Sequence, residues 1–221
     1  MTVARYQKIM HVLRRRQPDL TVLAERIYKP HNLSAMIRTC DAVGIGTVHA
    51  VNPTGGVPTY NATSASADKW VELVVHRSLA EVRTHLHDQG MQLLAAHLSE
   101  QACDYRDVDY TRPTCILFGN EKEGISAEAA EAADRHIVIP MYGMVQSLNV
   151  SVATAVILFE AQRQRRDAGL YDAPRLSERA MNEQAFVWLY PRQAELLRAT
   201  GEPFPALDEW GEPAPAVRGD R

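Results

Sequence analysis

Two kinds of apolar pattern alternate along the chain. Short apolar runs predict strands over 21–27, 47–52, 70–75, 91–97, 113–119 and 136–140. Apolar residues at helical spacing predict helices over 4–16, 32–43, 78–89, 126–134 and 147–168, with more helix over 177–200. This alternation is typical of an α/β protein whose mostly parallel sheet carries helices on both faces. Ligands of such sheets bind beyond the carboxyl ends of the strands, so the segments that follow the strands are the candidate site.

Capping residues and turn formers set the expected limits of these elements. Asn32 has the side chain of an N-cap, and Gly44 marks the end of the same helix. Ser78 and Glu81 have the spacing of a capping box. The segment 53–67 is rich in turn formers and is too long for an ordinary connection. The tail over 201–221 holds four prolines, so we expect it to be poorly ordered.

Charge is distributed unevenly along the 221 residues. The net charge of −3 argues by itself against a nucleic-acid partner. However, residues 1–18 contain no acid and carry five basic residues: Arg5, Lys8, Arg14, Arg15 and Arg16. The segment 201–221 carries five acids against two arginines. A basic end can bind phosphates even when an acidic tail hides it in the total, and a solvated helix face is the alternative reading.

Composition also limits the compartment and the cofactors. The three cysteines, Cys40, Cys103 and Cys115, form no C-x-x-C pair, so we expect reduced thiols and neither a disulfide framework nor a metal site. No segment approaches the roughly 20 apolar residues of a membrane span, and no signal-peptide core follows the first residues. We therefore expect a soluble cytoplasmic protein. The phosphate-binding loops of common nucleotide-binding proteins and the nucleophile elbow of hydrolases do not occur in the sequence.

The first candidate segment, 29–44, follows a predicted strand and contains Asn32 and Arg38. Six residues correspond to about 240° of helical turn, so the two side chains cannot share a helix face. Asn32 therefore suits a cap or a strand end, and Arg38 points elsewhere. Capping and a surface or ion-pair role are the structural alternatives for these two residues.

Two further segments combine a strand end with unusual chemistry. In 116–126 an apolar strand leads into Gly119, Glu121 and Gly124, where glycines let a ligand approach the backbone. A plain strand-to-helix turn is the alternative there. In 139–166 a loop with proline and glycine leads to Ser147 and Asn149 at the start of an apolar helix. Small polar residues at this point cap the helix or hold a ligand.

Taken together, the three segments resemble the tRNA (guanosine-2′-O)-methyltransferases of the SPOUT class. The family's first motif, an Asn and an Arg six residues apart, is matched by Asn32 and Arg38. The second, a strand followed by Gly-x-Glu-x-x-Gly, is matched by Gly119, Glu121 and Gly124. The third is matched by Pro140, Gly143, Ser147, Leu148, Asn149 and Ser151. The resemblance covers residues 4–172, and three motifs in the right order are far more specific than any one.

The resemblance implies a fold that the pattern alone does not give. Members of this class thread the C-terminal part of the sheet into a deep trefoil knot, which breaks the general rule that chains are unknotted. The knot forms the cofactor pocket, and the protein is a homodimer. On this basis we expect a basic N-terminal helix over 1–18, a SPOUT catalytic domain over 19–172, and a helical extension with an acidic tail over 173–221.

The resemblance also implies an activity and its residues. S-adenosylmethionine would donate a methyl group to the 2′-hydroxyl of guanosine 18 in the tRNA D-loop, without a metal ion. The cofactor would lie near His97, Gly119, Ile139, Pro140 and Leu148. The catalytic set would be Arg38, Asn32, Glu121, Ser147 and Asn149. In this set Asn32 would hold Arg38 or the ribose, Glu121 would organise the second loop, and Ser147 and Asn149 would orient Arg38 or the substrate across the dimer.

Arginine is effectively always protonated in proteins, so Arg38 suits a phosphate and oxyanion clamp better than a general base. The tRNA backbone would lie on Arg5, Lys8, Arg14, Arg15, Arg16, Arg163, Arg165 and Arg166. We expect neutralisation of Arg14, Arg15 and Arg16 to weaken tRNA binding. Two alternatives are the same chemistry on ribosomal RNA, and a non-catalytic RNA-binding protein of the same fold.

Overall fold

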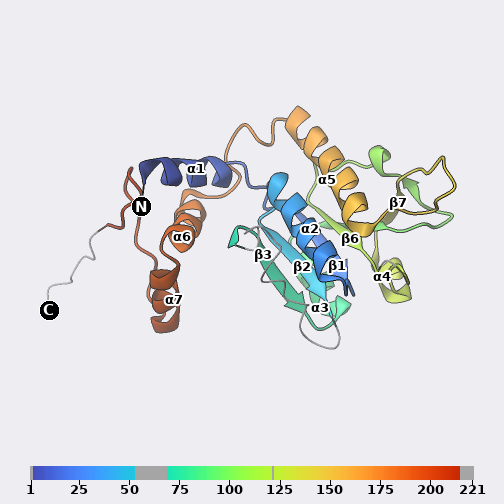
Figure 1. The fold of residues 1–221 in the computed structure, drawn as a ribbon, viewed down its shortest axis with the longest axis horizontal. Coiled ribbons are helices and arrows are strands. Elements are labelled where there is room, and N and C mark those ends of the chain that lie inside the picture. The colour runs from blue at the N-terminus through green and yellow to red at the C-terminus, as the bar shows by residue number, and fades with distance from the viewer. Residues whose placement is uncertain (1, 53–68, 121, 215–221) are drawn as a thin grey trace. The chain divides into compact units, whose positions relative to one another are not determined.

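The computed structural model describes residues 2–52, 69–120 and 122–214 (Figure 1). The predicted loop 53–67, Glu121 and residues 215–221 of the tail lie outside the described residues. The chain divides into two compact units. One is Gln17–Leu170, and the other joins the two ends of the chain, Met1–Arg16 and Tyr171–Arg221.

The larger unit is built on a seven-stranded sheet in which every pairing is parallel. Its strands are β1 (Leu20–Glu25), β2 (Thr47–Val51), β3 (Glu72–His76), β4 (Gln92–Ala96), β5 (Cys103–Asp104), β6 (Thr114–Phe118) and β7 (Arg135–Val138), in the order β3-β2-β1-β6-β4-β7-β5. The predicted parallel sheet is therefore confirmed. The sequence did not predict β5, because two residues are too few to show a period.

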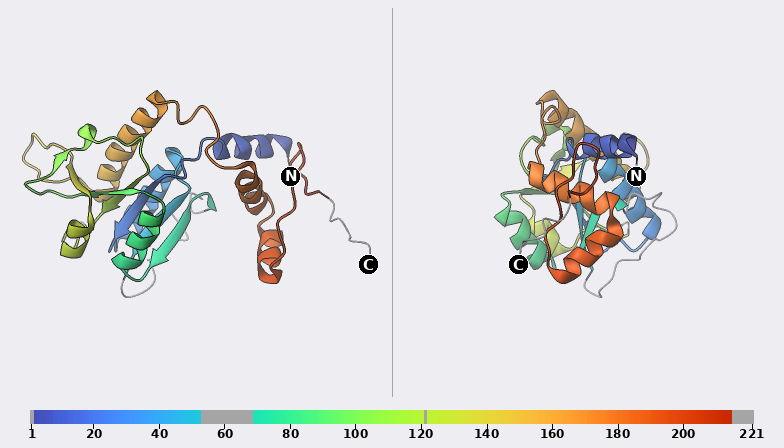
Figure 2. Two further views of the ribbon diagram at one scale, coloured as in Figure 1. Left: turned by 180° about the vertical axis from the view of Figure 1, so that it is seen from behind. Right: turned by 90° about the vertical axis from the view of Figure 1, so that its left-hand side faces the viewer.

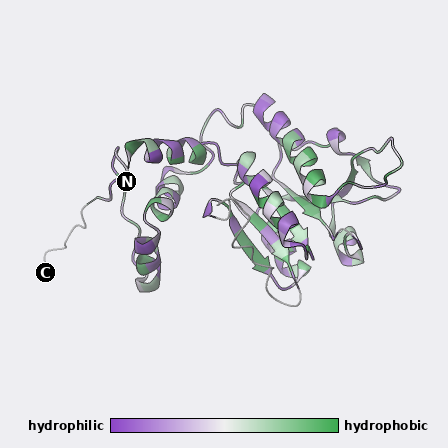
Figure 3. Cartoon of the chain, in the orientation of Figure 1, coloured by the Kyte–Doolittle hydropathy of each residue, from purple (hydrophilic) through white to green (hydrophobic). Residues whose placement is uncertain are grey.

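Helices cover both faces of the sheet, as predicted (Figures 1 and 2). On one face α2 (Pro30–Ala42) and α5 (Val150–Asp167) pack on Val22 and Ile116. On the other face α3 (Leu79–Asp88) and α4 (Ala127–Ala132) pack on Leu23 and Leu117. The central strands β1 and β6 are buried along their whole length, and the sheet is mainly apolar in Figure 3, which is typical of parallel strands buried on both sides.

Three helix limits differ from those predicted. Helix α2 begins at Pro30, because proline fits the first helical position, and Asn32 is therefore inside the first turn and not the cap. Helix α5 begins at Val150, because the side chain of Asn149 caps it, and not at Ser147. Helix α1 (Val3–Leu13) ends before Arg14, so the run of three arginines follows the helix.

The smaller unit is helical. Helix α1 contacts α6 (Glu178–Leu189), and α7 (Pro191–Thr200) follows directly, because Pro191 starts a new helix within the predicted 177–200 segment. The guanidinium of Arg16 lies 5.5 Å from the ring centroid of Trp188, and Arg16 is only 3% exposed. The expectation of a poorly ordered tail is wrong for residues 201–214. Asn182 donates to the Pro205 carbonyl and accepts from the Leu207 amide.

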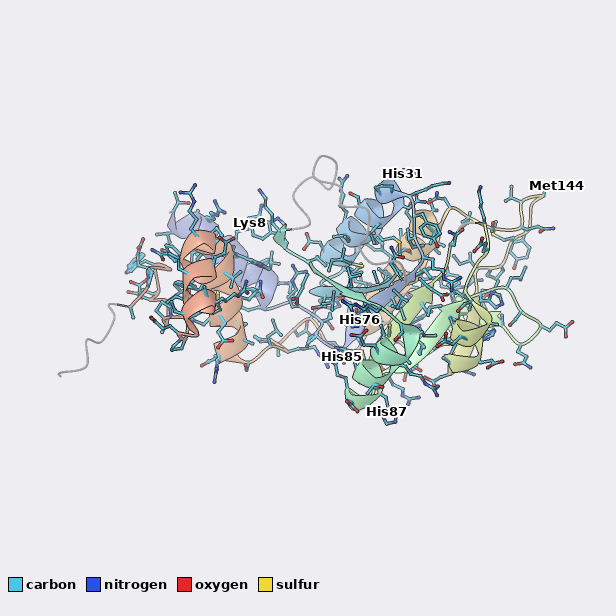
Figure 4. All side chains as sticks on the ribbon, turned by 90° about the horizontal axis from the view of Figure 1, so that it is seen from below. Lys8, His31, His76, His85, His87 and Met144 are labelled. Atoms are coloured by element: carbon cyan, nitrogen blue, oxygen red, sulfur yellow. The ribbon has the colours of Figure 1, made fainter. Side chains whose placement is uncertain are left out.

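Three histidines meet beneath β2 and β3, where His76 and His85 lie close together in Figure 4. His49 and His76 share a hydrogen bond of 3.0 Å between Nδ1 and Nε2. Burial, and then the nearby charges of His76 and His85, lower the pKa of His49 to about 4. His49 is therefore neutral at neutral pH and serves the core. Within the described ranges, no group of three His, Cys, Asp or Glu residues is arranged to hold a metal ion.

Among the residues that the structure describes, no helix combines the length and the apolar character needed to cross a membrane.

Candidate active site

A cavity of about 280 Å³ opens at the carboxyl ends of β4, β6 and β7. Three segments that follow these strands form most of its wall, and the start of α5 closes it. Of the residues predicted to hold a cofactor, His97, Gly119, Ile139 and Leu148 line the cavity. Pro140 lies between two lining residues without lining the cavity itself. Its size and mostly apolar wall suit a small ligand.

The sequence did not single out several other residues of this wall. Phe118, Val138 and Ala96 are the last residues of their strands, and Gln146 precedes Ser147 in the loop before α5. The signal that could have identified them is their position, because parallel strands end at a common edge. Strand β4 pairs with β6 and β7, which lie far from it in the sequence, so the sequence could not show that the ends of these strands lie side by side.

The loop after β6 is closed tightly on itself. Asn120 and Gly124 exchange two backbone hydrogen bonds of 2.9 Å. The Asn120 side chain accepts from the Lys122 amide at 2.7 Å and donates to the Arg26 carbonyl at 3.1 Å, which ties this loop to the end of β1. The buried carboxylate of Glu25 accepts from the Ser126 amide at 2.8 Å and holds the far side of the loop.

Gly119 has no room for a side chain. A Cβ at this position would overlap the backbone carbonyl group of Gly124 and would lie 2.5 Å from the amide nitrogen of Ile125. These are backbone atoms, so relief requires the loop to open. Glycine at this position therefore sets the shape of the cavity wall.

We expect Gly119→Ala to weaken cofactor binding by about tenfold to a hundredfold, since overpacking costs about 1–3 kcal/mol and here distorts the wall. Calorimetric titration with S-adenosylmethionine measures the effect. Gly143→Ala is the control, and its thermal stability should equal that of the wild type, because a Cβ there meets nothing within 4 Å. An unchanged dissociation constant for Gly119→Ala would contradict this account of the loop.

Asn32 and Asn149 are brought together from α2 and the start of α5. The Asn149 amide nitrogen donates to the Asn32 side-chain oxygen at 3.3 Å. The Asn149 oxygen accepts from the amide and the hydroxyl of Ser151, at 2.9 and 2.6 Å. Asn32 is 2% exposed. The pair therefore links the first turn of α2 to the helix that closes the cavity.

Arg38 lies exposed on another face of α2, as the spacing from Asn32 predicted. Asn32 and Arg38 therefore do not meet within one chain. Ser147 is exposed and lines the cavity.

His97 is the one histidine among the residues found to line the cavity. Its ring meets that of His136 edge to face, with 5.3 Å between centroids. Burial, and then the nearby charge of His136, lower the pKa of His97. The cavity wall is therefore neutral at this point near neutral pH, which suits a cationic ligand.

The predicted RNA contacts separate into three kinds: exposed, exposed but paired with acids, and buried. Arg5, Lys8, Arg14 and Arg15 are exposed. Arg163 and Arg166 are exposed as well, but acids partly neutralise their charge. Arg163 pairs with Glu160 and Asp167, and Arg166 pairs with Asp167.

Two of the predicted contacts are wrong. Arg165 is 0% exposed because it is bound to Asp19 and to backbone carbonyls inside the larger unit. Arg16 is 3% exposed because it packs on Trp188. Neither guanidinium is open to a nucleic acid.

Comparison with known proteins places these features in a family. The SpoU rRNA Methylase family model matches residues 19–159, and the model described as SpoU, rRNA methylase, C-terminal, matches residues 163–213. The tRNA (guanosine(18)-2′-O)-methyltransferase of Thermus thermophilus is 61% identical over 188 residues, which are 85% of this chain and 97% of that protein.

Solved structures agree with this assignment. The A. aeolicus TrmH/SpoU tRNA modifying enzyme has a TM-score of 0.81 at 41% identity, over 86% of this chain and 96% of that one. The SpoU methyltransferase AviRb from Streptomyces viridochromogenes, in complex with the cofactor AdoMet, has a TM-score of 0.62 at 29% identity, over 68% of this chain and 59% of that one. The chain therefore belongs to the SpoU rRNA methylase family.

Proposed function

We propose that this protein methylates the 2′-hydroxyl of guanosine 18 in the tRNA D-loop and takes the methyl group from S-adenosylmethionine. The cavity at the carboxyl ends of β4, β6 and β7 carries this proposal, because the segments that hold the second and third family motifs form much of its wall. The named activity of the Thermus thermophilus relative, at 61% identity, supplies the substrate. We place the reaction in the cytoplasm, together with its tRNA.

The cavity suits the proposed cofactor. Its wall is mostly apolar, as an adenine requires, and Gly119 brings the backbone close to the enclosed space. The neutral ring of His97 leaves room for a positive charge. His97, Gly119, Ile139 and Leu148 would hold the cofactor, with Pro140 supporting the loop. When bound, it supplies an activated methyl group, so the reaction needs no metal ion.

The chain's own residues must orient the ribose and stabilise the developing negative charge on its 2′-oxygen. Arg38 is exposed and cationic, which suits a clamp on the target phosphate and the oxyanion. A phosphate oxygen or a water molecule then accepts the proton. Asn32 and Asn149 fix the junction of α2 and α5, and Ser147 orients the substrate at the cavity. The resemblance also implies a role for Glu121, which lies outside the described residues.

We further propose a homodimer with the knotted topology of its class and with the division into 1–18, 19–172 and 173–221. Five large apolar side chains are exposed on the loop before α5 and on α5 itself: Tyr142, Met144, Val145, Val152 and Phe159. Met144 projects from the loop in Figure 4 and is 99% exposed. An apolar surface of this kind beside the cavity suits a second copy of the chain.

The basic residues near the N-terminus would hold the tRNA backbone. We expect Arg14→Ala with Arg15→Ala to weaken tRNA binding and to reduce the slope of its salt dependence by about two, because each lost phosphate contact removes about one. Filter binding over a salt series measures both effects. A matched pair, Arg77→Ala with Arg83→Ala, removes two exposed charges near α3 and should leave the slope unchanged. Equal slopes for all three proteins would refute this role.

The decisive experiment supplies the purified protein with labelled S-adenosylmethionine and an unmodified tRNA transcript. Resistance to alkaline cleavage then maps any 2′-O-methyl group. We expect a single methylated ribose at guanosine 18. Cofactor binding with transfer only to ribosomal RNA would favour the first alternative, and RNA binding without cofactor binding would favour the non-catalytic one.

A further inference from the structure

His136 of β7 lies behind the cavity wall with both ring nitrogens engaged. Nε2 lies 3.0 Å from the Ala130 carbonyl of α4, and Nδ1 lies 2.8 Å from the Ser99 hydroxyl. A carbonyl only accepts, so Nε2 carries the proton and donates. Nδ1 of the neutral ring therefore accepts from Ser99. This chain fixes both the tautomer and the orientation of His136.

The same ring supports the segment that follows β4. Its edge-to-face contact with His97 has an interplanar angle of 81°, and His97 lines the cavity. The His97 amide donates to the Ile137 carbonyl at 3.1 Å, next to His136 in the chain. His136 thus contacts His97, which lines the cavity, and Ser99, which lies two residues further along the same segment.

The residues around the two rings differ between the outer side of His136 and the cavity side of His97. On the outer side His136 borders a hollow with Cys103, Glu131, Asp134 and Arg135. The Asp134 carboxylate accepts from the Leu93 amide at 2.7 Å, and the Cys103 thiol donates to the His136 carbonyl at 3.5 Å. On the cavity side the polar residues near His97 are uncharged, namely Asn120, Gln146 and Ser147.

We propose that His136 is a positioning residue of the cofactor site, which holds residues 97–99 through Ser99 and keeps the ring of His97 in place as a neutral wall. The inference rests on the proposed cofactor. His136 contacts His97 and Ser99 and is not among the described residues that line the cavity, so its effect is on the geometry of the wall and not on the reacting atoms.

The arrangement also makes cofactor affinity depend on charge. S-adenosylmethionine carries a positive sulfonium, and its demethylated product, S-adenosylhomocysteine, does not. Burial lowers the pKa of His97, so its ring is neutral near neutral pH and becomes charged only at a pH below the ordinary pKa of histidine. A protonated His97 would repel the sulfonium. Affinity for S-adenosylmethionine should therefore fall as pH drops below about 6.5, and affinity for the product should fall less.

Calorimetric titration of the full chain with each compound, between about pH 5 and about pH 8, tests the proposal. We expect His136→Ala and Ser99→Ala to raise the dissociation constant for S-adenosylmethionine about tenfold at the upper pH. At saturating cofactor, kcat should stay within about twofold of wild type. Ser99→Thr keeps the hydroxyl and should restore the affinity. His87→Ala, an exposed histidine of α3 labelled in Figure 4, is the matched control and should bind as wild type.

The outcomes separate the inference from the proposed function. A wild type that binds neither compound refutes both. A wild type that binds S-adenosylmethionine, with His136→Ala and Ser99→Ala binding equally well, refutes the positioning role alone. A loss of affinity that Ser99→Thr does not repair, together with a lower melting temperature in every variant at this site, shows a merely structural role and also refutes it. Equal pH dependence for the two compounds refutes the charge argument.

Discussion

Replacing Arg165 by alanine will lower the free energy of unfolding by about 3–5 kcal/mol, because the change leaves a buried network without its cation. The guanidinium donates to the Asp19 carboxylate at 2.7 Å and to the Gln17 side chain at 3.1 Å. It also donates to the carbonyls of Tyr110, Asp19 and Arg112, at 2.8, 3.1 and 3.0 Å. These contacts join α5 to the entry of β1 and to the segment before β6, so several elements loosen together.

Urea denaturation followed by circular dichroism measures this loss. Arg163→Ala is the matched control, because Arg163 lies on the same helix but its side chain is 52% exposed. An exposed ion pair contributes at most about 1 kcal/mol, so the control should stay near wild type. Arg165→Lys keeps the charge but loses the planar guanidinium with its several donors. We expect its loss of unfolding free energy to fall between those of Arg165→Ala and Arg163→Ala. A loss below about 1 kcal/mol for Arg165→Ala would contradict the network.

Arg165 also shows what charge patterns in a sequence do not reveal. Arg163, Arg165 and Arg166 read as one basic group, but neighbouring residues on a helix face different directions. Leu158, Ala161 and Arg165 follow at intervals of three and four, and all three are buried. The sequence thus held a signal that Arg165 continues an apolar stripe. Its partners Gln17 and Asp19 are far away in the sequence, so nothing local indicated what would satisfy a buried guanidinium.

The sheet was predictable where local signals were strong. Strand β6, for example, is apolar from Cys115 to Phe118, and the structure buries it on both sides. Strand order was not predictable, because β1 pairs with β6 across about ninety residues of chain. The rule that ligands bind at strand ends nevertheless located the cavity, since it needs only the direction of the strands and not their order.

The candidate site was predictable in its parts but not in its assembly. The sequence predicted that Asn32 and Arg38 point in different directions, which the structure confirms, but it made Asn32 a cap or strand-end residue where the structure places it inside the first turn of α2. It gave no sign that Asn32 meets Asn149, because this contact depends on the packing of α2 against α5. His136 carried no motif at all. Its relation to Ser99 depends on the parallel pairing of β4 with β7, which places His136 opposite Ala95, shortly before the segment that contains Ser99.

Arg38→Ala should reduce kcat for methyl transfer by about 10²–10³, which is the usual effect of removing one group that stabilises an oxyanion. The dissociation constant for S-adenosylmethionine should not change, because Arg38 is absent from the residues that line the cavity. Arg38→Lys keeps the charge without the fork and should recover only part of the rate. Single-turnover transfer to a tRNA transcript measures the rate, and a rate within tenfold of wild type for Arg38→Ala would exclude the clamp role.

A mixture of Arg38→Ala and Gly119→Ala, assayed at a cofactor concentration too low to fill the Gly119→Ala cavity, decides which chain supplies Arg38. Arg38→Ala has an intact cavity, and Gly119→Ala has an intact Arg38 but a distorted cavity wall. If Arg38 acts at the cavity of the partner chain, each mixed dimer has one complete site, and equal amounts that exchange freely should regain about one quarter of the wild-type rate. If Arg38 acts within its own chain, every site in the mixture lacks one part and the rate stays low. The exposed apolar residues beside the cavity, and the separation of Arg38 from Asn32 on α2, both favour the first result.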